Sequence, residues 1–291
     1  MSSVVFFNFN IMQLYSIETG NFKLDGGAMF GVVPKVLWNK QYPADEKNLC
    51  NWAMRSMLIV DGDRKILIDN GIGDTLDKKF LGHFYLNGDY SLESSLKKHD
   101  YSATDITDVI LTHLHFDHCG GNVKRKADGT GFEAAFPNAK YWINGEQYNC
   151  SMQPNTREKA SFYPYMVSAV ADSGQMILID KEVEIVPGIS LRFYNGHTDG
   201  QIIPFIKYND RTIVFMGDLL PSVAHLPLSW VMAYDMRPLL TIQEKETFLN
   251  EAVDNDYILF FEHDIYYECC DLQKTDKGIR VKDTFKLEEV R

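Results

Sequence analysis

The chain has 291 residues, of which 45% are hydrophobic and 24% charged, a composition typical of soluble globular enzymes. Its formal net charge of −11 disfavours a nucleic-acid partner, and with it a nuclease, because phosphate binding relies on an excess of Lys and Arg. No apolar run approaches the ~18 residues needed to cross a bilayer, so we expect no membrane span. Scattered Cys residues without a Cys-x-x-Cys pair favour a reduced, cytoplasmic setting. No Pro/Gly/Ser-rich linker divides the sequence, and we expect one domain over 1–291.

Strand and helix signals form two clusters along the chain. In the first, a turn at 61–64 joins apolar runs at 57–60 and 66–68, a pattern that predicts a β-hairpin. A strand is predicted over 4–15 before this hairpin. A helix over 92–99 with Ser91 as its N-cap, and a short buried strand over 109–111, are predicted after it.

The second cluster begins near Met176 and repeats this order. Strands are predicted over 189–194, 202–207, 212–215 and 257–261, and a helix over 242–253 opens with a capping-box pattern from Thr241 to Glu244. The intervening region 124–175 is mixed, with helices expected near 145–150 and 163–171. The repetition predicts an α/β (α+β) protein of two similar halves, each a sheet with one face covered.

The strongest chemical signal is the stretch THLHFDHCGG at 112–121, which follows the apolar run 109–111. It places His113, His115, Asp117 and His118 in the spacing His-x-His-x-Asp-His. Imidazole nitrogen and carboxylate oxygen are donors that zinc, iron and manganese accept. Alternation sends the first two imidazoles to one side of an extended segment, and the next two residues can face a second ion. The motif therefore predicts two metals.

Two metals need more than four protein donors, because a zinc site takes three or four. Three further donors each follow an apolar run, where the end of a strand can present them to a common cleft: His197 after 189–194, Asp218 after 213–215 and His263 after 258–261. Their shared local context predicts that they complete the site.

Together, these donors resemble the ligand pattern of the metallo-β-lactamase superfamily of hydrolases, over almost the whole chain. The resemblance implies a four-layer αββα sandwich with its site at one edge, between the two sheets. It assigns one metal to His113, His115 and His197, the other to Asp117, His118 and His263, and makes Asp218 the bridge. Both ions are expected to be divalent, most simply Zn²⁺.

Two stretches resemble a narrower branch, the quorum-quenching lactonases that hydrolyse N-acyl homoserine lactones. They are DGGAMFGVVP at 25–34, followed by Trp38, and segments within 217–235. The second stretch is shared in part with organophosphate hydrolases of the methyl-parathion type. For a lactonase, the resemblance implies attack on the lactone carbonyl by a hydroxide held between the two ions, with Asp117 as proton shuttle. Asp117 and Asp218 are thus the predicted catalytic residues.

One position departs from the lactonase pattern. Well-studied members carry a Tyr three residues after the bridging Asp, and this chain has Pro221 there. His225 and Tyr234 are candidates to replace that Tyr in contacting the substrate. Four apolar residues in the resembling segments are candidates to line a pocket for an acyl tail: Met29, Phe30, Phe116 and Trp230.

Three other activities fit parts of the pattern. An aryl- or phosphotriesterase would use the same ligand set on another substrate. An iron persulfide dioxygenase would use one iron held by His113, His115, His197 and an Asp. A thioester hydrolase of the glyoxalase II type would need a C-terminal helical region. The expected partners are a small-molecule substrate with an apolar tail and, in a homodimer, a second copy of the chain.

Overall fold

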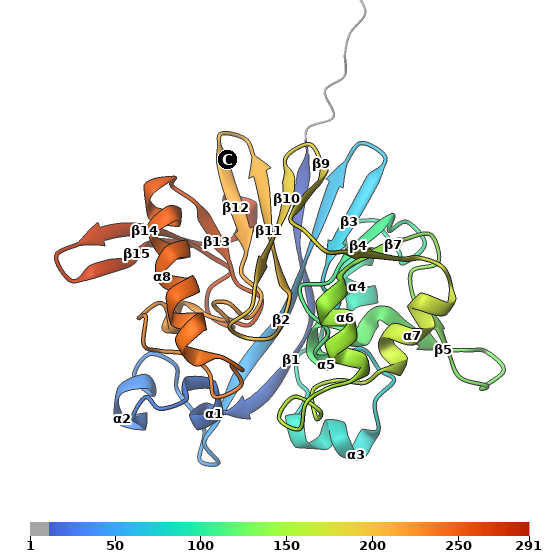
Figure 1. Cartoon of the computed structure of the whole chain (residues 1–291), viewed down its shortest axis with the longest axis horizontal. Helices are drawn as coiled ribbons and strands as arrows, with labels where there is room; N and C mark the ends of the chain where they lie inside the picture. Colours follow the sequence, from blue (N-terminus) through green and yellow to red (C-terminus); the bar gives the residue numbers. More distant parts are fainter. Residues whose placement is uncertain (1–11, 291) are drawn as a thin grey trace, which may run out of the picture.

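The computed structural model describes residues 12–290 and contains two β-sheets that face each other, with helices on their outer faces (Figure 1). The four-layer αββα sandwich is confirmed. The first sheet has the strand order β1 (Gln13–Asp25), β2 (Leu49–Asp61), β3 (Arg64–Ile68), β4 (Asp108–Ile110), β7 (Lys140–Asn144) and β8 (Met176–Ile179). The second has the order β15 (Gly278–Phe285), β14 (Cys269–Thr275), β13 (Ile258–Phe260), β12 (Arg211–Phe215), β11 (Gln201–Tyr208), β10 (Ile189–Tyr194) and β9 (Val183–Val186).

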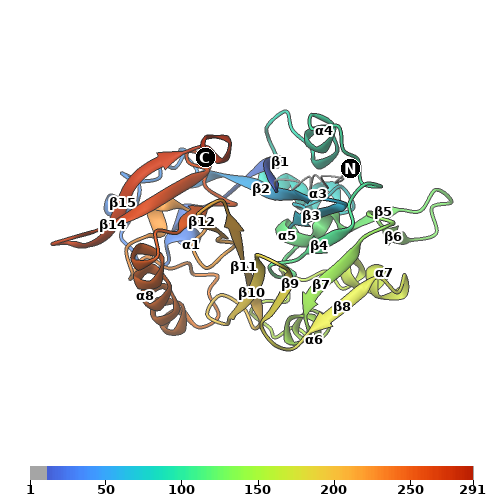
Figure 2. The same cartoon turned by 90° about the horizontal axis from the view of Figure 1, so that it is seen from above.

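Helices cover the outside of this pair of sheets. On the side of the first sheet lie α3 (Lys78–Leu81), α4 (Leu92–Lys97), α5 (Phe116–Cys119), α6 (Gly145–Met152) and α7 (Tyr165–Asp172), with the small hairpin β5 (Val123–Arg125) and β6 (Phe132–Ala134). On the side of the second sheet lies α8 (Pro238–Asp254), as the view from above also shows (Figure 2). Two short helices, α1 (Gly26–Phe30) and α2 (Lys35–Trp38), follow β1. Single 3₁₀ turns lie at Gly82–Phe84, Gly120–Asn122, Val223–His225 and Leu287–Glu289.

Central strands are apolar on both faces because each sheet is covered on both sides. In β3, Ile66 and Ile68 join the core between the two sheets, whereas Leu67 joins the core beneath the helices. In the second sheet, Phe215 of β12 faces the first sheet and Val214 packs in the cluster that contains Phe248 of α8. Continuous Ile/Val/Leu/Phe runs, rather than alternating ones, are the sequence signature of such strands.

The main sequence predictions of secondary structure are confirmed, with some differences. The hairpin of β2 and β3, the helix capped by Ser91 and the strands of the second cluster are present. Of the strand predicted over 4–15, residues 4–11 lie outside the described part, and β1 continues to Asp25. The strand at Met176 belongs to the first sheet, parallel to β7, and not to the second half as expected. Strands β5, β6, β7, β9, β14 and β15 were not predicted.

The prediction of a capping box at Thr241 is wrong. Helix α8 begins at Pro238, since proline suits the first helical turn, and Thr241 lies inside it. Glu244 instead accepts hydrogen bonds from the backbone N–H groups of Asn195 (2.7 Å) and Gly196 (2.9 Å). It therefore holds the turn that leads from β10 to His197.

The topology brings the ends of several strands to one edge of the sandwich. Strands β3 and β4 are parallel, as are β12 and β13, so their carboxyl ends share that edge. Backbone hydrogen bonds join the two halves there: Ala53 N–H donates to the carbonyl of His263 (3.1 Å), and Ile202 N–H to that of Thr112 (2.6 Å). Among residues 12–290, no helix has the length and hydropathy required to cross a bilayer.

Candidate metal centre

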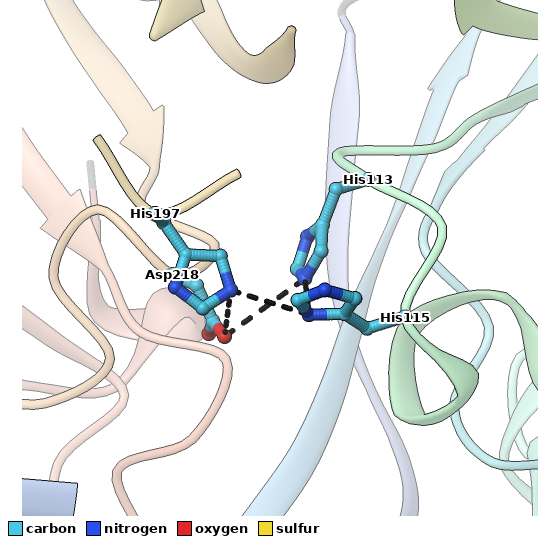
Figure 3. Close-up of side chains that lie close together, drawn as sticks. All are labelled: His113, His115, His197 and Asp218. Carbon is cyan, nitrogen blue, oxygen red and sulfur yellow. Dashed lines mark hydrogen bonds and ion pairs between the residues drawn. The ribbon is translucent and has the colours of Figure 1, made fainter. Parts of the chain in front are cut away.

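All seven predicted metal ligands meet at the edge where the strands end. His113 and His115 lie in the segment after β4, Asp117 and His118 in α5, His197 after β10, Asp218 after β12 and His263 after β13. Figure 3 shows His113 and His115 on one side of the gap between the sheets, with His197 and Asp218 opposite and the side chains pointing toward one another. The donors form two groups, which we name the three-histidine group (His113, His115, His197 with Asp218) and the aspartate group (Asp117, His118, His263).

In the three-histidine group, ring nitrogens converge on one point. His115 Nδ1 lies 3.0 Å from His113 Nε2 and 3.3 Å from His197 Nε2. Asp218 Oδ2 lies 3.2 Å from His197 Nε2 and 3.9 Å from His113 Nε2. Three imidazoles and a carboxylate that face one another in this way match the donor set of a zinc site.

The aspartate group lies on the other side of Asp218. His118 Nε2 and His263 Nε2 are 3.1 Å apart, and Asp117 Oδ2 lies 3.8 Å and 3.9 Å from them. Asp218 Oδ1 is 3.1 Å from His263 Nε2 and is buried without a well-directed hydrogen bond among the described residues. One oxygen of Asp218 thus faces each group. A bridging carboxylate between two cations accounts for both oxygens, so the residues fit a two-metal centre.

Behind every imidazole except that of His115, the nitrogen that faces away from the centre has a hydrogen-bond partner. Thr112 Oγ1 lies 3.1 Å from His113 Nδ1, Asp235 Oδ1 lies 2.9 Å from His197 Nδ1, and the carbonyl of Ala53 accepts from His263 Nδ1 at 2.8 Å. On the far side of His115, Glu158 Oε1 is 3.7 Å from Nε2. Partners of this kind fix the tautomer and orientation of metal-binding rings. His118 differs, because two carboxylates face its Nδ1: Asp69 at 3.1 Å and Glu262 at 3.0 Å.

The electrostatics of the centre favour a cation. Burial lowers the pKa of His113 and His115, so both rings stay neutral, which is the metal-binding form. Burial also opposes charge on His118, but Glu262, Asp117 and Asp218 outweigh it and raise its pKa well above the usual value. The surrounding carboxylates therefore demand positive charge at this position.

An apolar cavity of 280 Å³ opens onto the centre. Its wall is formed mainly by the hydrophobic side chains of Phe22, Leu24, Met29, Phe80, Phe84, Phe116 and Met232. At its floor lie His115, Asp117, His197, Asp218 and His263. The remaining polar residues of the lining are Arg157, Glu158, Ser161 and Tyr234. A small molecule with an apolar tail and a polar, hydrolysable end fits this distribution.

The structure divides the predicted substrate residues into two sets. Met29, Phe116 and Tyr234 line the cavity. Phe30, His225 and Trp230 do not line it, and their prediction as substrate contacts is revised. The ring of Phe30 stacks on His225 at 4.6 Å and meets Trp230 edge-on at 5.9 Å, in a layer behind the wall.

His225 is occupied by protein contacts in that layer. Its ring nitrogens pair with Ser222 Oγ (2.7 Å) and the carbonyl of Met29 (2.8 Å), and burial lowers its pKa to about 3. Pro221 also lies behind the wall, beside His225 and Trp230. Tyr234 is therefore the candidate that remains for the position of the missing Tyr.

Four carboxylates around the ligands were not predicted: Asp69, Glu158, Asp235 and Glu262. Asp69 follows β3 and Glu262 follows β13, so both carry the signal that located Asp218, a polar residue directly after an apolar run. Glu158 and Asp235 lie in irregular segments, where no local pattern marks them.

The comparisons with known proteins agree with this geometry. Residues 55–263 match the metallo-beta-lactamase superfamily. An N-acyl homoserine lactonase of Bacillus thuringiensis is 24% identical over 269 residues, which cover 89% of this chain and 95% of the relative. A solved structure of a probable metal-dependent hydrolase from Staphylococcus aureus is 32% identical, covers 98% of this chain and 100% of its own, and superposes with a TM-score of 0.87.

A second solved structure is AidC, a dizinc quorum-quenching lactonase in complex with a product, N-hexanoyl-L-homoserine. It is 20% identical with a TM-score of 0.77, over 94% of this chain and 95% of its own. At that identity the similarity concerns the fold alone. On the match over 55–263, the chain belongs to the metallo-β-lactamase superfamily and is a metal-dependent hydrolase of that fold.

Proposed function

We propose that this protein opens the ring of a lactone of the N-acyl homoserine type, using two divalent metal ions, most simply Zn²⁺. The observation that carries the proposal is a cavity whose apolar wall leads to both groups of ligands. An acyl tail would lie along Phe22, Phe84 and Phe116, with the lactone at the floor. The seven candidate ligands would hold the ions, which would polarise the carbonyl and supply a hydroxide at neutral pH.

Residues of this chain would supply the remaining steps. Asp117 is in the cavity lining, and its side chain is 13% exposed, so it can exchange protons with a bound substrate. We assign it the role of proton shuttle. Burial, with Asp117 and Asp25 nearby, raises the pKa of Tyr234 to about 12, so its phenol stays protonated at neutral pH. Tyr234 can therefore donate a hydrogen bond to the substrate carbonyl.

The relatives support this choice of substrate. The curated relatives from Bacillus are N-acyl homoserine lactonases. One solved N-acyl homoserine lactone hydrolase holds the product N-hexanoyl-L-homoserine at its catalytic metal centre, with 20% identity and a TM-score of 0.67. The wall of the cavity described above has the apolar character that such an acyl chain requires.

The proposal is tested by comparing substrates on one zinc-loaded preparation. We expect kcat/KM for N-hexanoyl homoserine lactone to exceed kcat/KM for an aryl ester and for a phosphotriester such as methyl parathion. Proton release measures the hydrolysis of the lactone. A preference for either of the latter would replace the proposed substrate while keeping the metal chemistry. A content of one iron per chain, with oxygen consumption on glutathione persulfide, would contradict hydrolysis altogether.

The role of Tyr234 has its own test. Tyr234→Phe removes one hydrogen bond and should lower kcat/KM for the lactone by about 3- to 10-fold, the range of a neutral hydrogen bond. Tyr163→Phe is the matched control, because Tyr163 packs edge-on to Phe116 at 6.0 Å without lining the cavity. Equal kinetics for wild type and Tyr234→Phe would exclude a contact between this phenol and the substrate.

A further inference from the structure

Glu262 is a fully buried carboxylate directly behind a candidate metal ligand. It follows β13, has no exposed surface, and places Oε2 3.0 Å from Nδ1 of His118. The other ring nitrogen of His118 faces His263 and Asp117 in the aspartate group. Glu262 thus lies on the far side of the imidazole from the metal position.

A second carboxylate, Asp69, already satisfies the Nδ1 of His118. Asp69 Oδ2 pairs with that nitrogen at 3.1 Å and accepts from the hydroxyl of Thr112 at 2.6 Å, while Oδ1 accepts from Thr112 N–H at 2.8 Å. An imidazole nitrogen carries at most one hydrogen. Because Asp69 forms the better-aligned hydrogen bond with His118 Nδ1, no hydrogen remains on that nitrogen for Glu262 to accept.

Apart from His118, no side chain among residues 12–290 forms a hydrogen bond or an ion pair with Glu262. Both of its oxygens are buried without a well-oriented hydrogen-bond partner among residues 12–290. The nearby guanidinium of Arg55 is directed elsewhere, to Glu18 (2.8 Å) and to the carbonyls of Phe261 (2.8 Å) and Asp264 (3.0 Å). A buried carboxylate without a partner destabilises a fold, so its presence requires an explanation outside folding.

We propose that Glu262 is a positioning residue that tightens metal binding by the aspartate group, acting through His118. The inference rests on the two-metal function proposed above. The hydrogen bond to Asp69 fixes the ring of His118, and the negative charge of Glu262, 3.0 Å from Nδ1, would make the opposite ring nitrogen a stronger metal ligand. Asp69 and Glu262 face one imidazole, which can carry at most one positive charge, so a bound cation would offset the charge of the second carboxylate. The residue therefore costs stability in the metal-free protein and contributes affinity in the metal-loaded one.

Asp69, His118 and Glu262 also lie close enough together to hold an ion of their own, with ligand atoms within 4.8 Å of one another. The hydrogen bonds argue against this reading. Thr112 already donates to both oxygens of Asp69, and His118 Nδ1 is bonded to Asp69. We therefore expect two ions per chain and not three.

The test is Glu262→Gln, which keeps the size of the side chain and removes its charge. Zinc affinity is measured by competition with a chromophoric chelator, and the melting temperature of the metal-free protein by thermal unfolding. We expect one of the two zinc affinities to fall by about 10- to 100-fold. The melting temperature of the metal-free variant should rise, because Asp69 and Glu262 would no longer be two acidic groups that share one imidazole.

Asp108→Asn is the matched control. Asp108 is also buried, but Arg64 (2.7 Å) and Trp142 Nε1 (2.9 Å) bond to it at the far end of β4. Its loss should lower the melting temperature and leave both zinc affinities unchanged. Opposite signs of the two stability changes would distinguish a carboxylate kept for metal binding from one kept for folding.

If the wild-type protein binds two zinc ions, three results would overturn the role of Glu262 and leave the proposed function intact. They are unchanged zinc affinities in Glu262→Gln, failure of that variant to fold, and a third bound ion in the wild type that the variant loses. A wild-type protein that binds fewer than two ions would instead overturn the proposed function, and this inference with it. The two failures are therefore distinguishable in one titration series.

Discussion

The three-histidine group and the aspartate group share Asp218 but differ in what lies behind their rings. In the first, a hydroxyl lies behind His113, the carboxylate of Asp235 behind His197, and that of Glu158 3.7 Å from the far nitrogen of His115. In the second, two carboxylates lie behind His118, while His263 is backed only by a main-chain carbonyl. Negative charge is thus concentrated behind one ring of the aspartate group. Two metal positions built from similar donors therefore need not be equivalent, and we expect them to bind zinc with different affinities.

Substitution of the shared ligand Asp218 should weaken metal binding at both groups. Asp218→Asn removes the negative charge that both groups share and replaces one carboxylate oxygen by an amide nitrogen that cannot bind a cation; in the wild type, Oδ2 lies 3.2 Å from His197 and Oδ1 3.1 Å from His263. We expect zinc content to fall at both positions and kcat for the lactone to fall by about 10³-fold or more, since a metal contributes several kcal/mol to catalysis. Elemental analysis and steady-state kinetics measure both. A variant that keeps two ions and full activity would contradict the bridging role.

Removal of a ligand from the aspartate group should weaken metal binding there and leave the three-histidine group able to bind its ion. His118→Ala deletes a nitrogen that faces only Asp117, Asp218 and His263. We expect about one zinc per chain to remain, and activity to fall by more than the ~10- to 100-fold that loss of an outer partner costs. His83→Ala is a suitable control, because His83 lies in a 3₁₀ turn away from both groups. Loss of both ions in His118→Ala would show that the groups do not bind independently.

The smallest expected effect concerns the outer partner of the three-histidine group. Asp235→Asn weakens the support of His197, whose Nδ1 lies 2.9 Å from the Asp235 carboxylate. Zinc affinity should fall by about 10-fold, at the position that Glu262→Gln leaves unchanged. Competition titrations of both single variants and of the double variant measure this. If both substitutions weakened the same zinc ion, the assignment of partners to groups would be wrong.

Much of this site was predictable because its donors follow a simple physical rule. Strands covered on both faces appear as apolar runs, and the polar residues that follow such a run lie near the edge of the sheet. That rule located His197, Asp218 and His263, and it applies equally to Asp69 and Glu262. The signal was present for these two, but only the structure shows that both face His118.

Other parts of the site depend on the paths of loops, which carry no local pattern. Asp235 reaches His197 because the preceding segment is anchored by Lys245 of α8. The ammonium of Lys245 donates to the carbonyls of His225 (2.7 Å), Pro227 (3.1 Å) and Trp230 (2.8 Å). The same path turns His225 and Trp230 away from the cavity and leaves Tyr234 in its lining. The sequence can indicate that an apolar residue lies near a site. It cannot indicate whether the side chain lines the cavity or packs in the layer behind its wall.

The backbone hydrogen bonds that join the two halves at the site have a consequence for how the protein becomes functional. Thr112 pairs with Ile202 and Ala53 with His263, so each bond closes a loop of many residues. Contacts between such distant parts of a chain form late in folding, because the entropy of loop closure opposes them. During synthesis, the aspartate group is incomplete until residue 263 has left the ribosome. The complete metal centre is thus a property of the finished fold, and the capacity for hydrolysis appears only when both sheets have docked.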